Sequence, residues 1–81
     1  MNGHRITEMY VFVAIEKDGD EGVCAFMHDG TMLPMVGSDR RRVDSLRPIA
    51  QAIADQTDTP IRLLRFISSE VVETIAPGGG P

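Results

Sequence analysis

The segment from Glu8 to Lys17 constrains the fold most, because it is rich in β-forming residues and apolar on both faces of the strand it predicts. Successive side chains of a strand point to opposite faces of the sheet. One face would carry Met9, Val11, Val13 and Ile15, and the other Tyr10, Phe12 and Ala14. We therefore expect this strand at the centre of a sheet, with a cover on each side. A chain of 81 residues has little material for two covers.

The Asp29-Gly30 pair predicts a tight hairpin. It separates two extended runs, Val23–His28 and Thr31–Val36. A two-residue type I′ turn needs positive φ at both central residues, which Asp and Gly tolerate. Pro34 has no N–H to donate, so the second run should be an edge strand.

One main helix is predicted from about 39 to 57. Ser38 or Asp39 can cap its start. An apolar stripe with helical spacing contains Val43, Leu46, Ala50, Ile53, Ala54 and Thr57. Pro48 projects on the other side and leaves two alternatives: one helix kinked at Pro48, or a helix that starts at Ser45 with the proline in its first turn. The continuous stripe favours the single helix.

The order β-β-β-α-β follows, because 61–67 predicts a last strand. Ser68-Ser69 can cap a short helical turn over 70–75. We expect an α+β fold with a four-stranded, mostly antiparallel sheet in the order 3-2-1-4, and with one main helix on one face. The last strand would run parallel to the first. Residues 8–75 would form the single domain, 1–7 a flexible leader and 76–81 a flexible tail.

A single helix covers only one face of this sheet, so the other face should remain apolar. The sequence leaves open which face that is. The candidate interface residues are Tyr10, Phe12, Phe26, Leu64 and Phe66, or the set on the opposite face. Because an exposed apolar patch marks an interaction site, we expect a homo-oligomer that forms through this face or through a free sheet edge.

The composition excludes several classes of protein. Twelve Asp/Glu against eight Lys/Arg give a net charge of −4, which argues against general nucleic-acid binding. No apolar run approaches the roughly 20 residues of a membrane span, and the N-terminus lacks a signal-peptide pattern, so we expect a cytoplasmic protein. A lone Cys24 builds neither a disulfide scaffold nor a cysteine-rich zinc site.

No catalytic motif is present in the sequence. There is no nucleophile elbow, no dinucleotide-binding glycine pattern and no phosphate-binding loop of the Walker type. We therefore expect no enzyme activity, no catalytic residues, no metal and no cofactor.

The basic run Arg40-Arg41-Arg42 is the best candidate for a ligand site. It occupies the first helical turn, where the helix dipole already supplies positive charge. A phosphate, a partner's carboxylates or the chain's own Asp39 and Asp44 would relieve this local excess. The alternative is a solvated helix face with local ion pairs. The candidate ligand-binding residues are Arg40, Arg41, Arg42, Arg47 and His28.

The segment LRPIAQAIAD, followed by a polar break, a proline and the apolar strand PIRLLRF, resembles small proteins of actinobacteria and their phages. Together with MYVFVAIEKDGDEG, the resemblance covers most of residues 9–75. No catalytic motif defines that group. For a phage protein, the resemblance implies an accessory or counter-defence role, in which a small acidic protein sequesters a host defence protein or a nucleotide immune signal.

Two functional hypotheses follow from the sequence. The first is a small non-enzymatic binding protein of phage type that sequesters an anionic, nucleotide-like ligand stoichiometrically. Its partner would be a phosphate-bearing small molecule. The second is an acidic protein–protein interaction module or inhibitor that blocks a host protein and has no small-molecule ligand.

Overall fold

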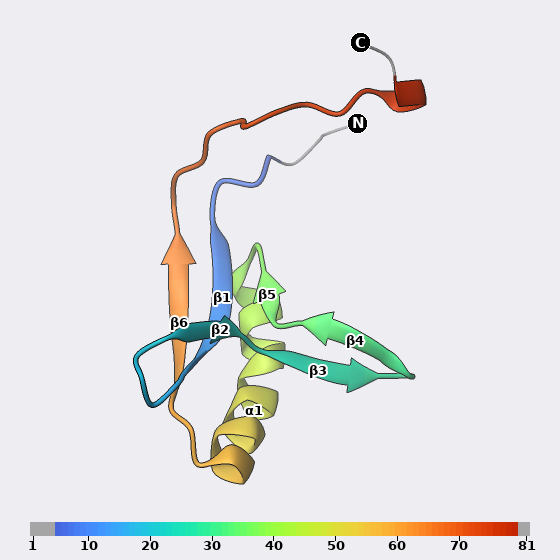
Figure 1. The fold of residues 1–81 in the computed structure, drawn as a ribbon. Coiled ribbons are helices and arrows are strands. Elements are labelled where there is room, and N and C mark those ends of the chain that lie inside the picture. Colours follow the sequence, from blue (N-terminus) through green and yellow to red (C-terminus); the bar gives the residue numbers. More distant parts are fainter. Residues whose placement is uncertain (1–4, 80–81) are drawn as a thin grey trace.

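A computed structural model describes residues 5–79 and shows an α+β fold with one main helix (Figure 1). The strands are β1 (Met9–Ile15), β2 (Glu21–Val23), β3 (Ala25–His28), β4 (Thr31–Pro34), β5 (Val36–Gly37) and β6 (Ile61–Phe66). The helix α1 spans Arg40–Thr57, and a 3₁₀ turn, η1, spans Pro77–Gly79. Every strand pair in residues 5–79 is antiparallel. The predicted α+β class with one main helix is therefore confirmed.

Strand β1 lies at the centre of the main sheet, as its two apolar faces predict. β6 pairs with one edge of β1 from Met9 to Ala14. The other edge of β1 is shared by two short strands: β2 pairs with its C-terminal part and β5 with its N-terminal part. β2 and β5 together thus act as a single edge strand that is interrupted in the middle.

The interruption is the β3–β4 hairpin, which leaves the sheet and projects from it (Figure 1). Three backbone hydrogen bonds hold its base. The N–H of Cys24 donates to the carbonyl of Phe12 at 2.9 Å, and the N–H of Phe12 donates to the carbonyl of Met35 at 3.0 Å. The N–H of Met35 then donates to the carbonyl of Cys24 at 2.8 Å. These bonds form a closed ring in which each residue donates once and accepts once.

The predicted strand order 3-2-1-4 in one sheet is wrong in two respects. The predicted second and third strands pair with each other, but they form a separate two-stranded sheet. The last strand does lie beside the first, as expected, but antiparallel to it. The reason is that the hairpin leaves and rejoins the same edge of β1, so the chain enters α1 from a strand antiparallel to β1.

The hairpin turn and its edge strand match the sequence. Asp29 and Gly30 have φ of 49° and 79°, the two positive values that a type I′ turn requires. Pro34 lies opposite Ala25 in β4, and within residues 5–79 β4 pairs with β3 alone. The missing N–H of Pro34 therefore interrupts no ladder.

Helix α1 is a single helix that continues through Pro48, so the predicted single helix is confirmed and the start at Ser45 is wrong. Asp39 is the N-cap residue, and its side chain accepts from the N–H of Arg42 at 2.9 Å. Asp58 ends the helix in the left-handed conformation. Pro48 is exposed, whereas Val43, Leu46 and Ala50 of the predicted stripe are buried.

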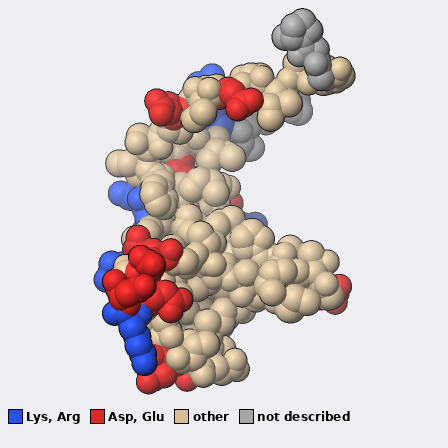
Figure 2. Space-filling model, viewed as in Figure 1, with Lys and Arg blue, Asp and Glu red and all other residues tan. Residues whose placement is uncertain are grey.

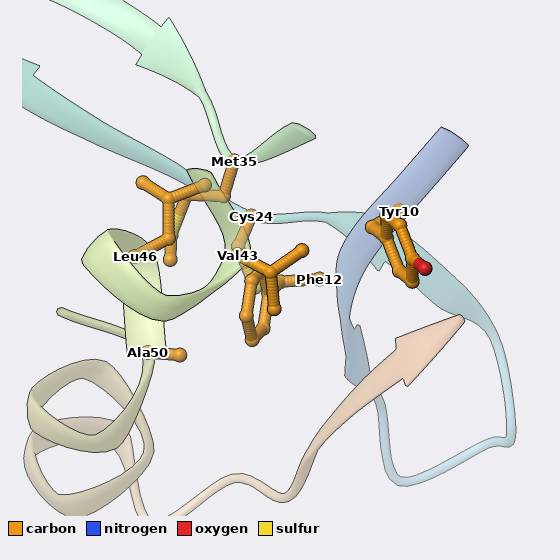
Figure 3. Close-up of a cluster of buried hydrophobic side chains, with 7 residues drawn as sticks. All are labelled: Tyr10, Phe12, Cys24, Met35, Val43, Leu46 and Ala50. Atoms are coloured by element: carbon orange, nitrogen blue, oxygen red, sulfur yellow. The ribbon is translucent and has the colours of Figure 1, made fainter. Parts of the chain in front are cut away.

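The core lies between α1 and one face of the main sheet (Figure 3). The helix contributes the three buried residues named above. β1 contributes Tyr10 and Phe12, and the hairpin base contributes Cys24 and Met35. Ile61 and Leu63 of β6 pack against this cluster and are partly buried. The three residues whose backbone hydrogen bonds hold the hairpin base therefore have their side chains in this core.

The chain after β6 differs from the prediction. Residues 70–75 are not helical, and the short helical turn lies later, at Pro77–Gly79. The physical reason is composition: Val71, Val72, Thr74 and Ile75 are β-branched and disfavour a short isolated helix. Residues 5–7 of the predicted leader have no regular structure, and 1–4 and 80–81 lie outside the described residues.

Candidate functional site

The basic run is exposed at the start of α1. Arg40, Arg41 and Arg42 are all solvent-exposed. The guanidinium carbon of Arg40 lies 5.8 Å from the centroid of the Tyr10 ring, within the range of a cation–π contact. The backbone N–H of Arg42 already donates to Asp39. One of the free N–H groups that could bind a phosphate is therefore occupied by the chain itself.

Arg47 and His28 do not complete a common site with this run. Arg47 lies about two turns further along α1 and pairs with Asp44 at 3.5 Å. His28 ends β3, next to the hairpin tip, and its Nε2 lies 3.5 Å from the carboxylate of Asp29. The hairpin projects away from the main sheet (Figure 1), so His28 near its tip lies apart from the arginines of α1.

The five predicted interface residues also separate into different environments. Tyr10 and Phe12 are buried under α1. Phe26 is partly buried against the same cluster. Leu64 and Phe66 lie on the other face of the sheet, because the register places Leu63 opposite Phe12. The sequence left open which face the helix covers, and the structure assigns it to the face of Tyr10 and Phe12.

The opposite face of the main sheet is apolar and carries no helix. We call it the open face; it comprises Met9, Val11, Val13, Ile15, Val23, Val36, Leu64 and Phe66. Val23 and Phe66, at its margins, expose 57% and 53% of their surface. At one end of the face, Arg62 and Glu21 form an exposed ion pair with 3.9 Å between Nη1 and Oε2.

A second apolar surface follows β6 in the chain. Residues 67–76, which we call the C-terminal arm, form no helix or strand and extend away from the body of the protein (Figure 1). Ile67, Val71, Val72 and Ile75 are the large apolar residues of this arm, and the last three each expose more than 80% of their surface. Such exposure of four β-branched residues in one short segment is unusual for a chain that stays alone in water.

A third apolar surface is the hairpin itself. Met27 and Met32 lie directly opposite each other, and each exposes 59% of its surface. Asp29 at the tip is the only charged residue among residues 25–34, and acidic side chains gather instead beside β2 (Figure 2). The sequence analysis did not select this methionine pair. The Asp29-Gly30 turn could have revealed it, because a two-residue turn fixes which residues face each other.

Other kinds of site find no support in the described part of the chain. No group of three or more His, Cys, Asp or Glu residues within residues 5–79 could hold a metal ion. No helix in this range is long and apolar enough to cross a membrane. Burial raises the pKa of the Cys24 thiol, which keeps it protonated and a poor nucleophile.

Comparison with protein-family models, with curated proteins and with solved structures gives no match for this chain.

Proposed function

We propose that this protein is a non-enzymatic binding module that associates stoichiometrically with another protein through its β3–β4 hairpin. The observation that carries the proposal is the exposed pair Met27 and Met32 on a hairpin that projects from the sheet. The hairpin presents an almost uncharged surface, with its one carboxylate at the tip.

The chemistry of methionine supports a protein partner. Its unbranched, polarisable side chain adapts to irregular apolar surfaces and is common at binding sites that accept a partner by repacking. A two-stranded hairpin is only marginally stable alone in water. Here the base is held by the hydrogen bonds among Phe12, Cys24 and Met35, so the projecting part can present the methionines in a defined position.

The anionic-ligand hypothesis has less support from the geometry. Arg40, Arg41 and Arg42 are exposed, and a guanidinium in open solvent holds an anion weakly. His28 and Arg47 lie elsewhere on the surface. Sequestration of a nucleotide-like ligand and a phage counter-defence role stay predictions from the sequence.

Photocrosslinking tests the proposal. A photoreactive amino acid is placed at Met32 and, as a control, at Gln56 on the exposed side of α1. In a lysate of the organism that encodes the protein, we expect one dominant crosslinked protein from position 32 and none from position 56. In a competition assay, an excess of unlabelled protein is added before crosslinking from position 32. We expect Met27→Asp/Met32→Asp to have lost the ability to bind the partner and so to compete, and Ala52→Asp/Gln56→Asp, with the same added charge, to compete as well as the parent protein.

Two results would contradict the proposal. One is the absence of any crosslink that depends on the hairpin. The other is a crosslink from position 32 only to a second copy of the chain, because the hairpin would then serve self-association.

A further inference from the structure

The protein exposes far more surface than a compact monomer of its size. Its accessible surface is 6793 Å², whereas a folded monomer of 8.9 kDa is expected to expose about 4,800 Å². Its radius of gyration is 15.7 Å, against about 12 Å for a compact domain of this length. The hairpin and the C-terminal arm, which project from the body of the protein, contribute to this excess of about 2,000 Å² (Figure 1).

This excess matches what an obligate dimer buries. Standard interfaces bury about 800 Å² on each partner, and obligate homodimers bury about 2,000–5,000 Å² in total. The hairpin supplies part of the excess and stays uncovered in such a dimer. Two copies that each buried half of the excess would remove about 2,000 Å², which is the lower end of the obligate range. We propose that a second copy of this chain covers the open face, and that the two copies exchange their C-terminal arms.

The arm fits the open face in length and in chemistry. Nine residues of extended chain from Phe66 to Ile75 reach about 30 Å, which is enough to cross a partner's β1. The arm presents Val71, Val72 and Ile75, and the open face presents a valine-rich, aliphatic surface. Both surfaces belong to the same chain. In a dimer with two-fold symmetry, the arm of each copy therefore covers the open face of the other copy.

Charge is also compatible with exchange. Glu70 and Glu73 are the charged residues of the arm and form no ion pair within residues 5–79. The open face carries at one end the exposed guanidinium of Arg62, which Glu21 approaches only to 3.9 Å. An arm laid along the partner's open face therefore brings carboxylates to a face whose cation is incompletely paired.

The arm also follows directly from β6, whose outer edge pairs with nothing in the described residues. A chain that leaves an edge strand in extended form is well placed to continue onto a neighbouring copy. In its own copy the arm packs against no part of the core. This makes it a favourable place for substitution, because a change there leaves the folded body intact.

Sedimentation equilibrium of the full chain tests the proposal. We expect a species of twice 8.9 kDa at micromolar concentration. The Val71→Asp/Val72→Asp variant should raise the dimer Kd at least about a hundredfold. The two side chains point to opposite sides of an extended arm, so whichever side faces the partner, one buried valine becomes a carboxylate. The control Ala52→Asp/Gln56→Asp adds the same charge to the exposed side of α1 and should leave the Kd unchanged.

Hydrogen exchange locates the contact. Amides of residues 68–76 should be protected at high protein concentration and should lose that protection on dilution or in the valine double variant. A monomer at all concentrations would overturn the proposal, and so would a dimer whose Kd the arm variant leaves unchanged. The hairpin variant Met27→Asp/Met32→Asp should still dimerise. The dimer proposal can therefore be refuted or supported without any effect on the proposed binding of another protein by the hairpin.

Discussion

The N–H of Met35 donates to the carbonyl oxygen of Cys24 at 2.8 Å, and this bond closes the base of the β3–β4 hairpin. Both side chains are buried in the cluster beneath α1. The point where the hairpin leaves the sheet is thus fixed twice, by backbone hydrogen bonds and by core packing. A segment inserted into an edge strand in this way can project without loosening the sheet, because the two halves of the strand remain paired with β1.

The buried thiol of Cys24 should make the stability fall at alkaline pH. Burial raises its pKa above the ordinary value of 9.0, so the unfolded chain loses the proton first as the pH rises. The stabilising contribution is complete below pH 9.0 and is lost as the pH rises through the higher pKa of the folded state. Urea unfolding at fixed protein concentration from neutral to alkaline pH measures this decline.

Cys24→Ala provides the control for this titration. We expect the variant to be less stable at neutral pH, since it leaves a small cavity, but to show a shallower alkaline decline. Equal alkaline slopes in the variant and the parent protein would show that other groups cause the decline.

Gly37 should tolerate no side chain. A Cβ at this position would lie 2.6 Å from Cγ and 2.9 Å from Cβ of Arg42, so the first turn of α1 would have to move. We expect Gly37→Ala to lower the free energy of unfolding by about 1–3 kcal/mol, as overpacking does. Gly22→Ala in β2 is the matched control, because a Cβ there meets nothing within 4 Å. A loss of equal size in both variants would contradict the steric explanation.

The elements that local chemistry determines could be predicted from the sequence. Asp29-Gly30 specifies a turn, Asp39 caps a helix and the apolar stripe carries α1 through Pro48. Each of these signals acts between residues close together in the chain. The central position of β1 was also predictable, because a strand with two apolar faces has few other places in a small fold.

The topology and the sites depend on contacts between distant segments. The local sequence around Cys24 and Met35 does not predict that the chain leaves the sheet at these residues, because both also fit a continuous strand. That single departure reverses the direction of the last strand relative to β1. The register of β6 against β1 places Leu63, rather than Leu64, on the same face as Phe12, which divides the predicted interface between two faces.

The Asp39 cap should contribute to stability both as a hydrogen-bond acceptor and as a charge. We expect Asp39→Ala to lower the free energy of unfolding by about 0.5–2 kcal/mol, because the N–H of Arg42 loses its acceptor. Asp39→Asn keeps an acceptor but removes the charge that offsets three arginines at the helix start. It should therefore lie between the parent and the alanine variant. Added salt should reduce the difference in free energy of unfolding between the parent protein and Asp39→Asn. If salt leaves this difference unchanged, the charge of Asp39 does not contribute to stability.

Replacing Pro48 should stabilise the protein. A proline inside a helix lacks the N–H that would donate to the carbonyl four residues earlier, here that of Asp44, and its ring crowds the same turn. Pro48 is exposed, so its removal opens no cavity in the core. We expect Pro48→Ala to raise the free energy of unfolding by about 2 kcal/mol, which is the helix gain of about 3 kcal/mol less the loss of up to about 1 kcal/mol from the added freedom of the unfolded chain. Gln56→Ala, also exposed on α1, should change it by less than about 0.5 kcal/mol. Urea titrations of the parent protein and the two variants, at the same protein concentration, measure these changes. A Pro48→Ala variant that is less stable than the parent would mean that the proline makes a favourable contact, with its own chain or with a second copy.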